Sequence, residues 1–137
     1  MSLVLDCSAT LAWIYPDETT AAIRQVFDVI AADGCFVPTL WRLEVANGLT
    51  VAERRGRVTP GFRADALRVL ELMSITQDPE TAVHAWTTTL QLADRFGLTL
   101  YDATYLELAQ RRSLPLASLD AALRDAGQAL QLNVMGL

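Results

Sequence analysis

The sequence predicts an α/β fold in which a parallel β-sheet is covered by helices on both faces. Short apolar runs of strand length alternate along the 137 residues with longer segments whose apolar positions recur every three or four residues. Repeated strand–helix units of this kind place the strands in parallel and pack the helices against the sheet. The chain has no internal repeat, low-complexity tract or linker, so we expect one domain spanning residues 1–137.

The chain opens with two strand–helix units. The apolar run Leu3–Cys7 predicts the first strand, and Ala9–Tyr15 predicts a short helix that Pro16 ends. Thr20–Ala32 carries its apolar residues at helical spacing and is followed by an Asp-Gly pair, which favours a helix stop. Cys35–Val37 is then expected to form the second strand.

The middle of the chain is expected to be mostly helical. Leu40–Arg54 follows a threonine cap, and a Thr-Pro pair opens another helix over Pro60–Met73. Ser74–Thr76 is the candidate third strand. One long helix is expected to follow Asp78, which would cap it, and to end at Phe96 before a glycine.

The last third completes the alternation. Thr99–Tyr101 leads into a helix over about Asp102–Arg111, and Leu114–Leu119 predicts the fourth strand. Ala121–Leu130 is expected to be helical, and Asn133–Met135 is a candidate for a final short strand.

Composition limits where the protein works. Hydrophobic residues make up 52% of the chain, yet no apolar run approaches the roughly 18 residues that cross a bilayer. The N-terminus lacks the basic start and cleavage site of a signal peptide. The two cysteines, Cys7 and Cys35, are too few for a disulfide framework, so we expect reduced, buried thiols. These features predict a soluble, cytoplasmic protein that does not contact the membrane.

Charge and residue types exclude several chemistries. The net charge of −5 argues against binding nucleic acid through a broad positive field, although a nuclease with a carboxylate site remains compatible with it. All eleven basic residues are arginine, which excludes a Walker A phosphate loop and a Schiff-base lysine. With His84 as the single histidine, there is no Cys/His zinc set and no pair of catalytic histidines.

Four acidic residues lie where a parallel α/β sheet gathers its functional groups, beyond the carboxyl ends of its strands. Asp6 ends the first strand, Asp120 follows the fourth, and Glu44 and Asp102 lie near helix starts. All four are in apolar surroundings, where an ionised carboxylate must be paired, hydrogen-bonded or metal-bound. Alternatives remain open for three of them: Asp102 and Asp120 fit helix N-caps, and Glu44 can pair with an arginine such as Arg42.

Clustered carboxylates suit a hard cation. Mg²⁺ and Mn²⁺ take oxygen ligands, commonly a few carboxylates together with water and substrate phosphate. Such ions promote phosphodiester hydrolysis without any histidine, cysteine or lysine, which matches what this chain lacks. The pattern therefore predicts a Mg²⁺ site, in which Mn²⁺ can substitute.

Four segments that contain these acids, taken together, resemble the PIN-domain ribonucleases, and among them the VapC-type toxins of toxin–antitoxin pairs. The last two acids are eighteen residues apart, as in that family. The segments are LDCSATLAWIYPDE, VPTLWRLEVANGL, LTLYDATYLELA and ASLDAAL.

The resemblance implies a three-layer α/β/α sandwich with a central parallel sheet of about five strands. It also implies that Asp6, Glu44, Asp102 and Asp120 form a catalytic, metal-binding cluster that cuts structured RNA, such as tRNA or rRNA. Members of the family are homodimers that a small antitoxin inhibits.

Further residues are candidates for supporting roles. Ser8 and Ser118 match small hydroxyl positions beside the family's acids, and they equally fit a helix cap and a turn residue. Asn47 lies one turn beyond Glu44 and is expected either to bond within the site or to pack between helices. Asp125, five residues past Asp120, points away from the same helix face and ranks below it.

Arginines and tryptophans are weaker candidates. Arg54 and Arg57 form the densest positive patch, which either contacts RNA phosphates or complements a helix dipole. For Trp13, Trp41 and Trp86, packing in the core or in a dimer outranks stacking on bases.

Two other functions compete with a ribonuclease. An Asp-dependent phosphoryl-transfer enzyme would need a second acid near Asp6 and a later lysine, but Ser8 occupies the position two residues on and no lysine exists. A catalytically inactive PIN-like binding module would be favoured by an incomplete acidic set, whereas this set is complete.

Overall fold

Five parallel strands form the centre of the protein, as the computed structural model, which describes all 137 residues, shows. In sheet order the strands run β3-β2-β1-β4-β5, and each pairs in parallel with its neighbours. Their bounds are β1 (Leu3–Leu5), β2 (Cys35–Val37), β3 (Ile75–Gln77), β4 (Leu116–Ala117) and β5 (Val134–Met135). The predicted parallel α/β sheet is therefore confirmed: β2 has the predicted bounds, β3 lies one residue later than predicted, and β1, β4 and β5 are shorter than predicted.

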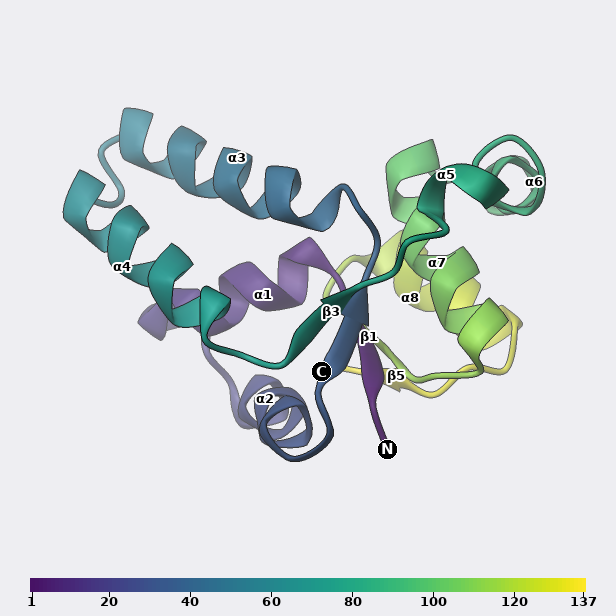
Figure 1. The fold of residues 1–137 in the computed structure, drawn as a ribbon, viewed down its shortest axis with the longest axis horizontal. Coiled ribbons are helices and arrows are strands. Elements are labelled where there is room, and N and C mark those ends of the chain that lie inside the picture. The colour runs from purple at the N-terminus through teal and green to yellow at the C-terminus, as the bar shows by residue number, and fades with distance from the viewer.

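Helices cover both faces of this sheet and complete a three-layer α/β/α sandwich. In Figure 1 the four N-terminal helices gather on one side of the strands and the four C-terminal helices on the other. None of the eight helices is both long enough and apolar enough to cross a membrane. They are α1 (Cys7–Ile14), α2 (Ala21–Asp33), α3 (Trp41–Arg54), α4 (Pro60–Glu71), α5 (Thr81–His84), α6 (Thr88–Phe96), α7 (Leu100–Arg112) and α8 (Ala121–Ala129).

The core is centred on β1, whose three residues are all fully buried. A strand that is covered on both faces carries apolar side chains without alternation, which is why LVL is continuous. Val4 lies in register with Phe36 of β2 and with Leu116 of β4. The chain leaves this central strand at Asp6, so the first acidic side chain directly follows a fully buried element of the fold.

Two of the three tryptophans pack in the interior. Trp41 is buried, and its indole nitrogen donates a hydrogen bond to the buried Thr10 hydroxyl at 3.0 Å. Trp13 stacks on Phe27 with ring centroids 4.5 Å apart. The predicted packing is confirmed for these two. Trp86 is 88% exposed, so it does not pack in the core.

The prediction of one long helix after Asp78 is wrong in one respect, because this segment forms two helices, α5 and α6. The backbone at Thr87 (φ −119°, ψ −101°) is not helical. Three consecutive β-branched threonines begin there, and such residues lose side-chain freedom in a helix.

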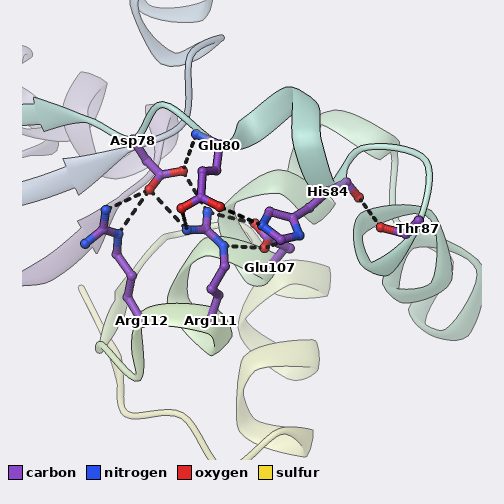
Figure 2. A network of polar contacts seen from close by, with 7 residues as sticks. All are labelled: Asp78, Glu80, His84, Thr87, Glu107, Arg111 and Arg112. Carbon is purple, nitrogen blue, oxygen red and sulfur yellow. Dashed lines mark hydrogen bonds and ion pairs between the residues drawn. The ribbon is translucent and has the colours of Figure 1, made fainter.

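Asp78 does not cap α5 as predicted, because Glu80 is the N-cap residue of that helix. Asp78 is instead fully buried at the end of β3, where Arg111 and Arg112 of α7 both donate hydrogen bonds to its carboxylate, the closest at 2.7 Å. Arg111 also bonds Glu107, and Figure 2 shows how this cluster continues through Glu80 and His84. The two arginines hold the pKa of Asp78 down at about 2, against the effect of burial.

We expect Arg111→Ala to lower the free energy of unfolding by about 3 kcal/mol or more, measured by urea denaturation. The substitution would leave the buried Glu107 carboxylate without its main partner and Asp78 with only one arginine. Arg68→Ala is the matched control, since the Arg68–Asp65 pair is exposed, and it should cost no more than about 1 kcal/mol. Equal effects of the two substitutions would contradict a structural role for the buried cluster.

Candidate active site

The predicted acids gather at the carboxyl ends of the two central strands. The chain moves outward from β1 to β2 and β3 on one side and through β4 to β5 on the other, so the strand order reverses between β1 and β4. In open α/β sheets a crevice forms outside the carboxyl ends at such a reversal. Asp6 directly follows β1, and Ser118 and Asp120 follow β4.

Asp6 is the most buried of the four acids, with 4% of its surface exposed. Its carboxylate caps α1 by accepting the Ala9 amide hydrogen at 2.9 Å, and it also accepts hydrogen bonds from the hydroxyls of Ser8 and Ser118. Burial raises its pKa to about 6, although these three donors favour the ionised form, and the negative charge of Asp102 adds to the rise. Asp6 is thus an acid whose ionisation is costly but whose orientation is fixed.

The two serines tie the ends of β1 and β4 together. Ser8 donates to both oxygens of Asp6, at 2.7 and 2.9 Å, and accepts the Leu119 amide hydrogen at 2.9 Å. Ser118 is fully buried, donates to Asp6 at 2.5 Å and accepts the Asp120 amide hydrogen at 3.0 Å. Ser8 is therefore not the helix cap, since Asp6 has that role, and both hydroxyls orient the Asp6 carboxylate.

Glu44 lies in the first turn of α3 and is half-buried. Its carboxylate accepts a hydrogen bond from the hydroxyl of Tyr105, which comes from α7. Burial and the charge of Asp102 raise the pKa of Glu44, while the Tyr105 hydrogen bond lowers it. Pairing with Arg42 is ruled out, because that arginine forms a two-bond pair with Glu71 at 2.8 Å.

Asp102 differs from the other acids because its carboxylate accepts no hydrogen bond within 3.5 Å, and its one neighbouring donor is the Thr99 hydroxyl. The predicted N-cap role is wrong: α7 begins two residues earlier than expected, and the Thr99 side chain caps it by accepting the Asp102 amide hydrogen at 3.1 Å. Asp102 is therefore in the first turn of α7, half-buried, with a free carboxylate. Burial and the negative charge of Asp120 both raise its pKa, while the Thr99 hydroxyl lowers it.

Asp120 is exposed and caps α8, accepting the Leu123 amide hydrogen at 2.9 Å. Its cap role is confirmed, and one carboxylate oxygen remains without a protein donor. Asp125 is also exposed, further along α8, and makes no hydrogen bond to any of the four acids.

Electrostatics connects the four acids through Asp102, whose charge raises the pKa of both Asp6 and Glu44 and whose own pKa is raised by Asp120. Cys7 lies beside them, and burial together with the charges of Glu44, Asp6 and Asp102 raises the pKa of its thiol to about 12. Both cysteines are free, as predicted; Cys35 is buried as expected, whereas Cys7 is only half-buried and stays a neutral thiol at the side of the cluster.

The donor chemistry of this cluster fits a hard divalent cation, since it offers only carboxylate and hydroxyl oxygens around an accumulated negative charge. The side chains do not form a ready-made cage: no three His, Cys, Asp or Glu side chains lie close enough together to hold an ion. Protein donors hold three of the four carboxylates in place, at Asp6, Glu44 and Asp120. Ion binding would therefore have to draw the carboxylates together.

The remaining candidates lie outside this cluster. Asn47 is exposed on α3 and makes no hydrogen bond to an acid. Arg57 is occupied within the protein, because it pairs with Glu18 and its guanidinium lies 3.9 Å from the centre of the Tyr15 ring. Arg54 is exposed at the end of α3, without an ion pair.

Sequence reasoning missed Tyr105 as a part of the site. It falls among the apolar positions of α7, and its spacing of three residues from Asp102 is the one signal that the two share a helix face. Its partner, Glu44, is 61 residues away in the chain, so only the tertiary structure shows that they meet.

Comparison with known proteins assigns the family. The sequence profile of the PIN domain matches residues 3–129, which include all four acids. The chain belongs to the PIN domain family. Ribonuclease VapC9 of Mycobacterium tuberculosis is 31% identical to it over 129 residues, which make up 93% of this chain and 92% of that protein. The VapC-type resemblance of the four acidic segments is thereby confirmed.

Solved structures agree on the fold of this PIN domain. PAE2754 from Pyrobaculum aerophilum superposes with a TM-score of 0.71 at 24% identity, covering 98% of this chain and 83% of that one. VapBC2 from Rickettsia felis, solved bound to a DNA fragment from its promoter, superposes with a TM-score of 0.64 at 11% identity over 98% and 97% of the two chains.

Proposed function

We propose that this PIN domain is a Mg²⁺-dependent endoribonuclease and the toxin of a toxin–antitoxin pair, acting in the cytoplasm. The observation that carries the proposal is the free carboxylate of Asp102, which lies at the strand-order reversal within the electrostatic reach of Asp6, Glu44 and Asp120. A half-buried acid with a raised pKa, whose one neighbouring donor is the Thr99 hydroxyl, is costly to keep ionised, which indicates a role in ligand binding rather than in stability.

The chain's own residues would divide the work as follows. Asp6 is held in one orientation by an amide and two serine hydroxyls, while Asp102 is free to turn toward an incoming ion. Glu44 and Asp120 would complete the ligand set from α3 and from the start of α8. A cation bound to these acids would supply Lewis-acid stabilisation of the negative charge that develops on a phosphodiester during hydrolysis. Mn²⁺ has the same ligand preferences and should replace Mg²⁺.

The proposed partners are an RNA, an antitoxin and a second copy of the chain. The VapC name of the 31%-identical relative supports an RNA substrate, for which tRNA and rRNA are the first to test. The VapBC2 name of a structural neighbour supports an antitoxin, and the homodimer is proposed from the family resemblance alone. The exposed Arg54 is better placed than the paired Arg57 to contact phosphates.

The test is cleavage of purified tRNA and rRNA by the isolated protein. We expect cleavage with millimolar Mg²⁺ or Mn²⁺ and none with EDTA, because the chain offers no metal-free set of histidines or lysines for the reaction. Mapping of the 5′ and 3′ ends would show whether cuts are internal. If the protein binds RNA but does not cut it with any metal ion, the proposed ribonuclease activity is overturned and an RNA-binding module is favoured.

A further inference from the structure

The one polar contact between the Glu44 side chain and the rest of the protein is the hydrogen bond from Tyr105. The two residues come from different helices on opposite sides of the sheet, Glu44 from α3 and Tyr105 from α7. Tyr105 is 1% exposed and lies one turn beyond Asp102 on the same helix. The bond therefore couples the position of Glu44 to the helix that carries the free acid.

We infer that Tyr105 is a positioning residue for the metal site, whose phenol holds one oxygen of Glu44 and leaves the other free to bind a cation beside Asp102. This inference rests on the proposed function. A glutamate has three rotatable side-chain bonds, and fixing them on ion binding costs conformational entropy. A donor that fixes the carboxylate beforehand reduces that cost, as second-shell partners of metal ligands do elsewhere.

The chemistry of Tyr105 suits this task better than a charged partner would. A phenol remains protonated at neutral pH, so it donates to the carboxylate without neutralising its charge. An arginine in the same place would cancel the negative charge that a cation needs. Burial fixes the ring itself, since Tyr105 is among the largest fully buried side chains of the core.

A second hydrogen bond fixes the backbone near Glu44. The Trp41 indole, at the first residue of α3, donates to Thr10 at 3.0 Å, and the Thr10 hydroxyl donates to the backbone oxygen of Asp6 at 2.7 Å. This chain sets the start of α3 relative to Asp6. Tyr105 then controls only the direction of the Glu44 side chain.

The test compares Tyr105→Phe with the native protein by calorimetric titration of Mn²⁺ without RNA. We expect the dissociation constant to rise about 10- to 100-fold, as for other second-shell residues. Tyr15→Phe is the matched control, because it removes the phenol hydroxyl of another buried tyrosine, one that bonds no acid, and it should leave Mn²⁺ affinity unchanged. In a Glu44→Ala background, which removes the acceptor of the Tyr105 hydrogen bond, Tyr105→Phe should cause less than about a twofold further change, since it acts through Glu44.

The outcomes separate this inference from the proposed function. Native protein that binds Mn²⁺ and cuts RNA while Tyr105→Phe binds Mn²⁺ equally well would overturn the role of Tyr105 alone. If Tyr105→Phe weakens Mn²⁺ binding equally in the native protein and in the Glu44→Ala background, the inference is also overturned, because the substitution would then have a general effect on folding. Native protein that neither binds Mn²⁺ nor cuts RNA would overturn both.

A measurement on the native protein covers the case in which Tyr105→Phe does not fold. The buried phenol proton should give a slowly exchanging downfield NMR signal, and this signal should shift as Mg²⁺ saturates the site. A signal that stays in place at saturating Mg²⁺ would contradict any link between Tyr105 and the metal site.

Discussion

Asp102→Asn is expected to lower the rate of RNA cleavage by about 100- to 1,000-fold or more, the loss seen when one transition-state-stabilising group is removed. The same substitution should leave the melting temperature unchanged or higher. The pKa of Asp102 is raised by burial and by Asp120, so its ionised form disfavours the folded state, and a neutral amide of the same size removes this effect. Cleavage assays and thermal melts without metal would measure the two effects.

The opposite directions of these effects make the prediction specific. A residue whose role is structural would lose stability and activity together when it is substituted. Asp125→Asn is the matched control, because Asp125 is an exposed helical acid without a bond to the site, and it should alter neither quantity. Full activity in Asp102→Asn would remove this residue from the site, and with it the observation on which the ribonuclease proposal depends.

Mg²⁺ or Mn²⁺ is expected to stabilise the folded protein at pH 7.5 by about 2.7 kcal/mol when its concentration is about 100 times the dissociation constant. That corresponds to about 10 °C in the melting temperature of a chain of this size. The ion relieves repulsion among carboxylates that the apoprotein can ionise only at a cost. Thermal melts with Mg²⁺, and with EDTA as the metal-free reference, would measure the shift.

The direction of the pH dependence follows from Asp6, whose pKa in the folded protein is about 6 against an ordinary value of 3.8. A raised acid pKa contributes stability at low pH that is lost as pH rises through about 6. Without metal, the protein should therefore be about 1 kcal/mol more stable at pH 5 than at pH 7.5 from this group. Asp78, with a pKa of about 2, stays ionised throughout and contributes nothing to this difference.

Metal stabilisation should show the reverse trend and fall to about half between pH 7.5 and pH 5, because protons compete with the ion for Asp6. Asp6→Asn is the decisive variant, since it should remove the Asp6 contribution to the pH difference of the apoprotein, leaving those of Glu44 and Asp102, and should also remove most of the metal effect. Equal metal-induced shifts at the two pH values would mean that the ion binds elsewhere.

Local patterns predicted most of the elements but not their ends. Gly34 and Gly97 follow the helices that they were expected to end, and both have positive φ, which glycine adopts without strain. The predicted helix ends were wrong at Thr87 and Thr99. The threonine run at Thr87 interrupts a predicted helix, and the Thr99 cap starts α7 two residues earlier than predicted. Helix ends depend on side-chain hydrogen bonds to the backbone within a few residues, and apolar periodicity does not report on these bonds.

The sequence by itself determined the parallel sheet, the four acidic positions and the family. These predictions depend only on residue types and on their spacing along the chain. The tertiary structure decided which acids are held and which is free. Whether Asp102 was a cap, whether Glu44 met Arg42 or Tyr105, and whether Asp78 capped a helix or bound two arginines all depended on contacts between distant segments. Such contacts are set by how the layers pack against one another, and no local pattern records that.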